Sequence, residues 1–248
     1  MNIAHLSDLH FGVHDPEAAS LLVADVTAWG PALTVVTGDL TMRARAGEFQ
    51  LARAFLDRLP GPVLVVTGNH DLPLDHPWRL YRPYHRYRAF ISADLDPVVR
   101  LPGVTAVGLQ SMPRWRWKDG LVRRSQLALV ESTFAAAPPD DLRLVALHHP
   151  PFGRTLLNGG KLLRAGADLL LAGHTHHPDV RPMNGTTVVV AGTATSRRVR
   201  RTPPSWSRIT SGDGVTTVTE RHFVAGGWRT ARLITVPRSR PVEQLSPK

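Results

Sequence analysis

The feature that most constrains this chain is a set of five short, largely apolar runs, each followed by residues of the kinds that bind metals. The runs span residues 3–6, 33–36, 63–66, 142–147 and 168–171. They lead into Asp8-Leu9-His10, Gly38-Asp39, Gly68-Asn69-His70-Asp71, His148 and Gly173-His174-Thr175-His176. In open α/β sheets, binding sites collect at the carboxyl ends of strands. We therefore expect one site, assembled from segments that lie far apart in the sequence.

Helical patterns separate the first three runs. Residues 16–29 and 45–59 repeat apolar side chains at helical spacing, and Pro60-Gly61-Pro62 ends the second helix. This β-α-β-α-β order predicts parallel strands joined by crossover helices. The middle of the chain predicts helical turns within 73–96, a strand at 104–109, a helix at 125–134 with Ser125 as its N-cap, and a short helix at 159–165.

After residue 185 the pattern changes to strands alone. They are expected at residues 186–190, 206–211, 215–223 and 228–236, with hairpin signals at 212–214 and 226–227. We predict a single α/β domain over residues 1–236, with mixed sheets packed between helices, and a flexible tail over 237–248.

Composition limits which ligands, cellular location and partners are expected of the protein. The chain has no cysteine, which excludes disulfides and thiolate ligands, and it has no apolar run long enough to span a membrane. The N-terminus shows no signal peptide, so a cytoplasmic location is expected. The formal charge of +10 suits anionic partners, but arginine supplies nearly all of it, so nucleic acid is not the favoured partner.

The spacing of the polar residues predicts a metal site. Asp8 and His10 are two residues apart, as are His174 and His176, and side chains at i and i+2 of an extended backbone point the same way. The pooled candidate ligands are two carboxylates, one amide oxygen and four imidazoles: Asp8, Asp39, Asn69, His10, His148, His174 and His176. Seven ligands exceed one tetrahedral metal and suit two metals with open positions.

Within this set, Asp39 stands alone between the two pairs and is the natural bridging ligand. His148 is taken as a ligand in preference to its neighbour His149, which is expected to lie behind it. Two divalent ions against two carboxylates leave a positive site that attracts phosphate and supplies a hydroxide nucleophile near neutral pH. His70 is the expected proton donor to the leaving group, and Asp71 either holds its tautomer, raises its pKa or is a plain turn residue.

At these residues the chain resembles the calcineurin-like metallophosphoesterase superfamily, whose motifs D-x-H, G-D, G-N-H-D/E, H and G-H-x-H occur here in that order. The G-N-H-D and G-H-T-H forms look most like class III cyclic-nucleotide phosphodiesterases and their bacterial relatives. The resemblance implies a four-layer αββα sandwich with two mixed sheets and a centre of two metal ions of the manganese, iron or zinc class. It implies that Asp8, His10, Asp39 and His176 hold one metal, that Asp39, Asn69, His148 and His174 hold the other, and that His70 is the general acid.

The resemblance leaves the substrate open. A small phosphodiester, with a cyclic nucleotide as the leading example, is the first expectation. A nucleotide-sugar or lipid pyrophosphate hydrolase and a nuclease that uses the basic surface are the alternatives. The stretch 79–90 either caps the cleft or is a helix with its tyrosines on the core and its arginines outward. The stretch 114–118 is an edge strand or a loop that flanks the entrance, and the run 197–201 is either a solvated loop or a contact for substrate or phosphate. Oligomeric state is open, with a homodimer through the late strands as one arrangement.

Overall fold

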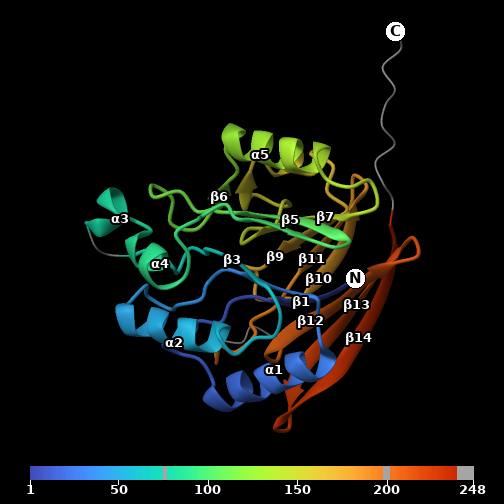
Figure 1. Ribbon diagram of the computed structural model, residues 1–248. Helices are drawn as coiled ribbons and strands as arrows, with labels where there is room; N and C mark the ends of the chain where they lie inside the picture. The colour runs from blue at the N-terminus through green and yellow to red at the C-terminus, as the bar shows by residue number, and fades with distance from the viewer. Residues whose placement is uncertain (75–76, 198–201, 239–248) are drawn as a thin grey trace.

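The computed structural model describes residues 1–74, 77–197 and 202–238. Two six-stranded sheets pack face to face, and helices cover the outer face of each sheet (Figure 1). This confirms the predicted four-layer αββα sandwich with two mixed sheets. None of the helices in the described residues is long and apolar enough to cross a membrane.

The first sheet has the strand order β14-β13-β12-β1-β2-β3. Its strands β1, β2 and β3 are parallel to one another, whereas β12, β13 and β14 continue the sheet in antiparallel fashion. The bounds are β1 Asn2–Leu6, β2 Leu33–Thr37, β3 Val63–Val66, β12 Ser205–Gly212, β13 Val215–Val224 and β14 Gly227–Pro237. The crossover helices α1 (Pro16–Trp29) and α2 (Ala46–Leu56) lie on its outer face (Figure 1).

The second sheet has the order β10-β11-β9-β7-β5-β4. Its four central strands are parallel, and the two edge strands β10 and β4 are antiparallel to their neighbours. The bounds are β4 Val98–Leu101, β5 Val104–Leu109, β7 Leu142–Leu147, β9 Leu169–Ala172, β10 Asp179–Met183 and β11 Thr186–Val190. Helices α5 (Arg124–Ala135) and α6 (Gly159–Leu162) and the small parallel pair β6 (Gly120–Leu121) and β8 (Leu156–Leu157) lie outside it.

Three apolar layers hold the sandwich together. Leu22 of α1 and Phe49 of α2 pack on the outer face of the first sheet, and Val130 of α5 packs on the second. Between the sheets, Val35 of β2 and Leu144 of β7 belong to a third cluster. Burying a side chain of this size contributes roughly 1.5–3 kcal/mol. The central strands are continuous apolar runs because both of their faces are covered.

Several expected boundaries were wrong in detail. Helix α5 begins at Arg124, and the backbone N–H of Arg123 donates to the Gln126 side chain, so Ser125 is inside the helix and is not its N-cap. Helices α2 and α6 end three residues earlier than expected, and β4, β6, β8 and β10 were not expected. The predicted tail begins too early, because Pro237 still belongs to β14. The rest of the tail from residue 239 and the run 198–201 lie outside the described residues.

The helical turns expected within 73–96 form two short helices, α3 (Trp78–Tyr81) and α4 (His85–Phe90). They are separate because Pro83 disfavours helical backbone at the preceding residue, and Arg82 has a φ of −140°. In Figure 1, α3 lies at the far left of the molecule, beyond the ends of both sheets.

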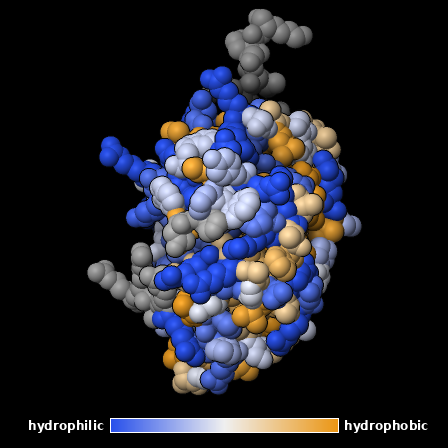
Figure 2. Space-filling model, turned by 90° about the vertical axis from the view of Figure 1, so that its left-hand side faces the viewer, coloured by the Kyte–Doolittle hydropathy of each residue, from blue (hydrophilic) through white to orange (hydrophobic). Residues whose placement is uncertain are grey.

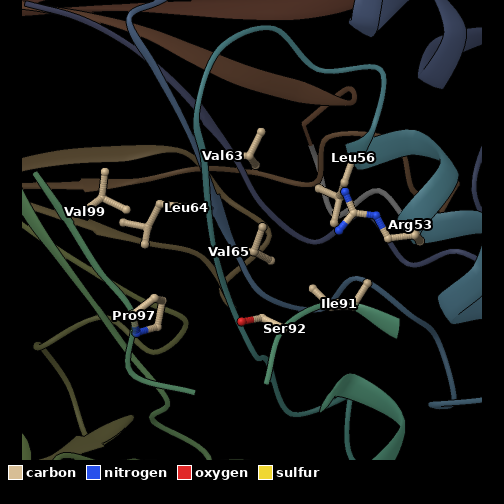
Figure 3. Close-up of a pocket in the computed structure, with 9 residues that line it drawn as sticks. All are labelled: Arg53, Leu56, Val63, Leu64, Val65, Ile91, Ser92, Pro97 and Val99. Carbon is tan, nitrogen blue, oxygen red and sulfur yellow. The ribbon is translucent and has the colours of Figure 1, made fainter. Parts of the chain in front are cut away.

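A cavity of about 210 Å³ opens at one edge of the sandwich (Figure 3). Residues of α2, β3, β4 and the segment after α4 line it, and most of these residues are apolar. Arg53, the cationic residue among those that line it, is paired with Asp57, the residue that follows α2. None of the predicted metal ligands lines this cavity, so it is separate from the candidate site.

Candidate metal centre

All of the predicted ligands follow the carboxyl end of a strand. Asp8 and His10 come after β1, Asp39 after β2 and Asn69 after β3 in the first sheet, and His148 follows β7, with His174 and His176 after β9, in the second sheet. The contacts join the two sheets, because His176 Nε2 lies 3.1 Å from Asp8 Oδ1 and His174 Nδ1 lies 3.1 Å from Asn69 Oδ1. The site therefore lies at the open end of the sandwich, where both sheets contribute.

The backbone at these positions differs from the extended backbone expected from the spacing. Asp8 and His10 have φ values of 54° and 50°, and His174 and His176 have φ values of 70° and 59°. Asp39 is also left-handed, with a φ of 51°. Each such residue costs roughly 1–2 kcal/mol. The ligand pairs converge because their loops are wound into this strained conformation, and such strain collects at functional sites.

One group of ligands contains Asp8, His10, Asp39 and His176, whose candidate ligand atoms lie within 4.8 Å of one another. The Nε2 atoms of His10 and His176 face each other at 3.2 Å. Asp8 Oδ1 is buried and receives no hydrogen bond from the described residues, although both of these nitrogens lie near it. A buried oxygen and two ring nitrogens that converge in this way fit a divalent metal with mixed N and O ligands.

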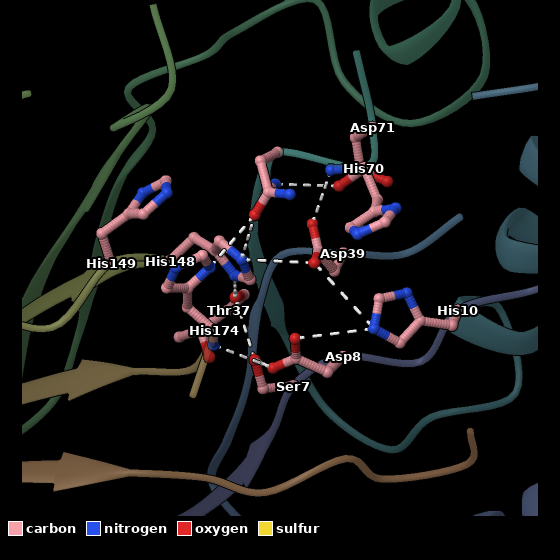
Figure 4. A network of polar contacts seen from close by, with 12 residues as sticks. Ser7, Asp8, His10, Thr37, Asp39, His70, Asp71, His148, His149 and His174 are labelled. Carbon is pink, nitrogen blue, oxygen red and sulfur yellow. Dashed lines mark hydrogen bonds and ion pairs between the residues drawn. The ribbon is translucent and has the colours of Figure 1, made fainter. Parts of the chain in front are cut away.

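The second group surrounds Asn69. Its Oδ1 atom lies 3.2 Å from His148 Nε2 and 3.1 Å from His174 Nδ1. Asp39 Oδ2 lies 3.4 Å from His148 Nε2 and 3.9 Å from His10 Nε2, so this carboxylate stands between the two groups (Figure 4). The arrangement fits two metal positions that share the Asp39 carboxylate.

Two residues that the sequence reasoning missed hold the ligands in place. The Ser7 hydroxyl donates to Asp8 Oδ2 at 2.6 Å and lies 3.0 Å from the Thr37 carbonyl oxygen (Figure 4). The same carbonyl accepts a hydrogen bond from His148 Nδ1 at 2.7 Å, which turns Nε2 toward Asp39. Such outer contacts fix the tautomer and the direction of metal ligands. The position of Ser7 and Thr37 at strand ends, next to Asp8 and Gly38, is the only sequence signal that could have identified these two residues.

His149 belongs by distance to a group with His148 and His174, whose candidate ligand atoms lie within 4.8 Å of one another, but its ring nitrogens contact other partners. Its Nδ1 atom lies 2.8 Å from Ser111 Oγ, and its Nε2 atom lies 2.8 Å from the Lys118 carbonyl oxygen. Because both ring nitrogens are engaged, His149 has no free lone pair for a metal. Its ring packs beside His174, with ring centroids 4.6 Å apart, and its supporting role behind His148 stays a prediction.

The His70 ring and the Asp71 carboxylate have different hydrogen-bond partners. The carbonyl of Met42, and not Asp71, contacts His70 Nδ1, at 2.8 Å. The Asp71 carboxylate accepts backbone N–H groups from Gly68 and Thr41, both at 2.9 Å, and from Leu40 at 3.2 Å. Asp71 therefore ties the loop after β3 to the loop after β2, and it was wrong to expect its carboxylate to set the tautomer of His70.

Burial and neighbouring charge shift several pKa values in the metal-free site. Burial disfavours the charged form of His148, but the Asp39 carboxylate outweighs it and raises the pKa of His148 to about 9. Burial lowers the pKa of His174 to about 4, helped by the charge of His148. Burial would raise the pKa of Asp8, but His176 and His148 hold it at about 2. At neutral pH the carboxylates of Asp8 and Asp39 are therefore ionised, and the proton that a metal must displace is on His148.

These shifts predict proton release on metal binding. Below its raised pKa, His148 holds a proton that competes with the metal, so metal affinity should increase as the pH rises and level off above about 9. Near pH 7.5, about one proton should leave per chain. Titration calorimetry of the metal-free protein with Mn²⁺ in buffers of different ionisation enthalpy measures this number. Proton release that is absent at pH 7.5 would contradict the assignment of His148.

Gly173 should be irreplaceable, because its backbone packs against the site. A Cβ atom at this position would lie 1.8 Å from Ser7 Oγ and 2.6 Å from Asp8 Oδ2. Gly173→Ala should displace Asp8, reduce metal content and destabilise the fold by about 1–3 kcal/mol. Metal analysis and thermal unfolding measure both effects. Gly47→Ala in α2 is the matched control, since its Cβ would meet nothing within 4 Å and alanine favours the helix.

Comparison with known proteins agrees with this geometry. The sequence profile of the family described as Calcineurin-like phosphoesterase matches residues 1–178. A probable cyclic nucleotide phosphodiesterase of Synechococcus sp. is 27% identical over 75% of this chain and 78% of its own length. A cAMP/cGMP dual specificity phosphodiesterase of Mycobacterium tuberculosis is 30% identical over 65% of this chain and 54% of its own length.

Solved structures show the same fold at low sequence identity. The purple acid phosphatase PPD1 of yellow lupin superposes with a TM-score of 0.73 at 12% identity, over 96% of this chain and 54% of that protein. Vps29 of Entamoeba histolytica superposes with a TM-score of 0.52 at 15% identity, over 95% of this chain and 99% of that protein. The profile covers most of this chain, including every predicted ligand. The chain therefore belongs to the calcineurin-like phosphoesterase family of metal-dependent phosphoric ester hydrolases.

Proposed function

We propose that this chain is a phosphodiesterase that uses two metal ions and acts on small anionic diesters, with a 3′,5′-cyclic nucleotide as the leading substrate. The observation that carries the proposal is the position of Asp39. Its Oδ2 atom faces His148 on one side and His10 on the other, while its Oδ1 atom accepts the His70 backbone N–H at 2.8 Å. A carboxylate fixed in this way can serve two metals at once.

The ligand sets follow from the two groups. Asp8, His10 and His176 would hold one ion, Asn69, His148 and His174 would hold the other, and Asp39 would bridge them. Divalent ions of the manganese, iron or zinc class suit such sulfur-free N and O ligands. When bound, the pair would polarise the phosphoryl oxygens and lower the pKa of water.

His70 is proposed as the proton donor to the departing oxygen. Its ring lies next to that of His10, with centroids 5.0 Å apart, and is only partly buried, so it can reach a substrate at the site. The contact of Nδ1 with the Met42 carbonyl requires a proton on Nδ1 and directs Nε2 away from it. When both nitrogens are protonated, Nδ1 stays on Met42 and Nε2 can donate. Asp71 supports this geometry through the two loops that it joins.

The names of the relatives support a diester substrate. Besides the cyclic-nucleotide enzymes, a glycerophosphodiester phosphodiesterase of Enterobacter lignolyticus is 36% identical over 29% of this chain and 30% of its own length. Glycerophosphodiesters are therefore the second candidate. The alternative activities are hydrolysis of a nucleotide-sugar or lipid pyrophosphate and hydrolysis of nucleic acid. A cytoplasmic location and a homodimer are proposed as well.

A substrate panel tests the proposal. Cyclic AMP, glycerophosphocholine, bis-p-nitrophenyl phosphate, a UDP-sugar lipid and single-stranded DNA would each be assayed with Mn²⁺ and with chelator. We expect metal-dependent turnover of the small diesters, with the cyclic nucleotide or the glycerophosphodiester hydrolysed best. Turnover of the UDP-sugar lipid or DNA alone would overturn the substrate class. Turnover that survives chelation would overturn the metal-dependent mechanism, and Asp39→Ala protein controls for contaminating enzymes.

A further inference from the structure

The exposed aromatic side chains are concentrated in two segments. Four large aromatic residues are exposed among the described residues, and all four lie in α3 or in the loop between β5 and β6. They are Trp78, Tyr81, Trp115 and Trp117, with 46, 78, 60 and 58% of their surface exposed. Leu80 of α3 is also 56% exposed. Large apolar side chains gathered on one surface of a protein mark a site of interaction.

Buried Arg79 joins the two segments into one surface. Its guanidinium donates to the carbonyl oxygens of Arg114, Arg116 and Pro73, and it packs 4.4 Å from the centre of the Trp117 ring. In return, Arg114 Nη1 donates to the Leu80 carbonyl oxygen at 3.0 Å. We call the surface formed by residues 78–82 and 114–118 the aromatic–basic tip. These cross-contacts fix its shape, so the side chains are presented together.

The tip carries a strong positive charge. Residues 78–82 and 114–118 contain five basic and no acidic residues, and the next residue, Asp119, is the nearest acid in the sequence. Arg82, Arg114 and Lys118 are exposed, and Arg116 is partly exposed. The side chains thus combine aromatic rings, one leucine and positive charge, a combination that suits a boundary between water and an anionic apolar phase.

The tip projects from the fold on the side of the metal centre. In Figure 1, α3 extends beyond the ends of both sheets, and Figure 2 views the molecule from this side, where strongly hydrophilic side chains cover much of the face. The loop is attached to the centre through the Lys118 carbonyl oxygen, which contacts His149 Nε2 at 2.8 Å. A binding partner of the tip would therefore lie close to the candidate metal ligands.

We propose that the aromatic–basic tip binds the surface of a membrane that contains anionic lipids. Tryptophan and tyrosine favour the headgroup region, leucine favours the acyl region, and arginine and lysine are attracted to anionic headgroups. Single-stranded nucleic acid is a weaker match, since stacking requires free ring faces. Arg79 already covers one face of Trp117, and Leu80 offers no ring at all. The proposal goes beyond the phosphodiesterase activity and does not depend on it.

Vesicle partitioning tests the proposal. Full-length protein would be mixed with vesicles of phosphatidylcholine, with and without phosphatidylglycerol, and the bound fraction measured by sedimentation. We expect binding to the anionic vesicles that weakens as salt increases. The double variant Tyr81→Ala/Trp115→Ala and the charge reversal Arg114→Glu/Lys118→Glu should each lower the partition coefficient about tenfold or more. Tyr81→Phe/Trp115→Phe should retain most of the binding.

Matched controls lie on β14, at the opposite side of the fold. Leu233→Ala removes a leucine that is 63% exposed, and Arg229→Glu reverses an exposed charge, so neither should change partitioning. Thermal unfolding of each variant shows whether the fold is kept. Wild-type protein that stays off anionic vesicles would overturn the proposal. Tip variants that bind like wild type would also overturn it, as would binding to an oligodeoxythymidylate probe alone.

Discussion

Asp39→Ala is expected to abolish both metal loading and hydrolysis. The substitution removes the carboxylate that lies between the two ligand groups, with Oδ2 at 3.4 Å from His148 Nε2 and 3.9 Å from His10 Nε2. Neither of the two proposed metal positions would then keep its full set of ligands. We expect kcat/KM on bis-p-nitrophenyl phosphate to decrease by a factor on the order of 10³ or more. Metal content by mass spectrometry, after loading with Mn²⁺ and desalting, should fall well below two ions per chain.

Asp57→Ala is the matched control for this experiment, because it removes an exposed carboxylate just after α2 that is paired, among the described residues, with Arg53 of that helix. It should keep both metals and full activity. If Asp39→Ala protein retained two metal ions, the bridging assignment would be wrong. The variant Asp39→Asn separates charge from shape, since an amide oxygen can still accept the His70 backbone N–H. It should bind metals weakly and remain folded.

His70→Ala is expected to slow substrates with poor leaving groups far more than activated esters. An alkoxide leaving group needs a proton, whereas p-nitrophenolate is stable without one. Loss of a positioned acid costs roughly 10²–10⁴-fold in rate. We expect a loss of this size on cyclic AMP or glycerophosphocholine and a much smaller loss on bis-p-nitrophenyl phosphate. A plot of rate against leaving-group pKa should therefore become steeper in the variant.

Equal losses on both classes of substrate would show that His70 binds phosphate instead of donating a proton. Two further variants sharpen the result. His85→Ala changes a histidine of α4 outside the site and should leave both rates unchanged. Asp71→Asn should disturb both substrate classes together, because the Asp71 carboxylate accepts three backbone N–H groups of the loops that carry Asp39 and Asn69.

Much of the fold could be predicted from the sequence because its patterns are local. The five runs that end at candidate ligands are strands in the structure, and α1 begins and ends where its apolar spacing indicates. Asp15 caps this helix by accepting the N–H groups of Glu17 and Ala18, and Gly30 ends it with a φ of 68°. Short edge strands such as β4 and β10 were missed because their side chains are only partly buried, so their apolar pattern is weak.

The candidate site was likewise predicted only in part from the sequence. The expectation that Asp8 and His10 point the same way relied on extended backbone, but both residues are left-handed. The role of Asp71 could not be read from its position next to His70, because two of its three backbone partners, Leu40 and Thr41, lie on a loop about 30 residues away. The choice between His148 and His149 depends on Ser111 and on Lys118, which sequence spacing does not bring near them.

The sequence by itself determined the kinds of ligand, their order along the chain and their placement after strands, because apolar periodicity and strand ends are local properties. Only the tertiary structure decided which atoms face one another. That outcome depends on how two sheets pack across an apolar layer and on loop dihedral angles held by distant partners such as Ser7, Thr37 and Gly173. These are contacts between residues far apart in the chain, and no local pattern specifies them.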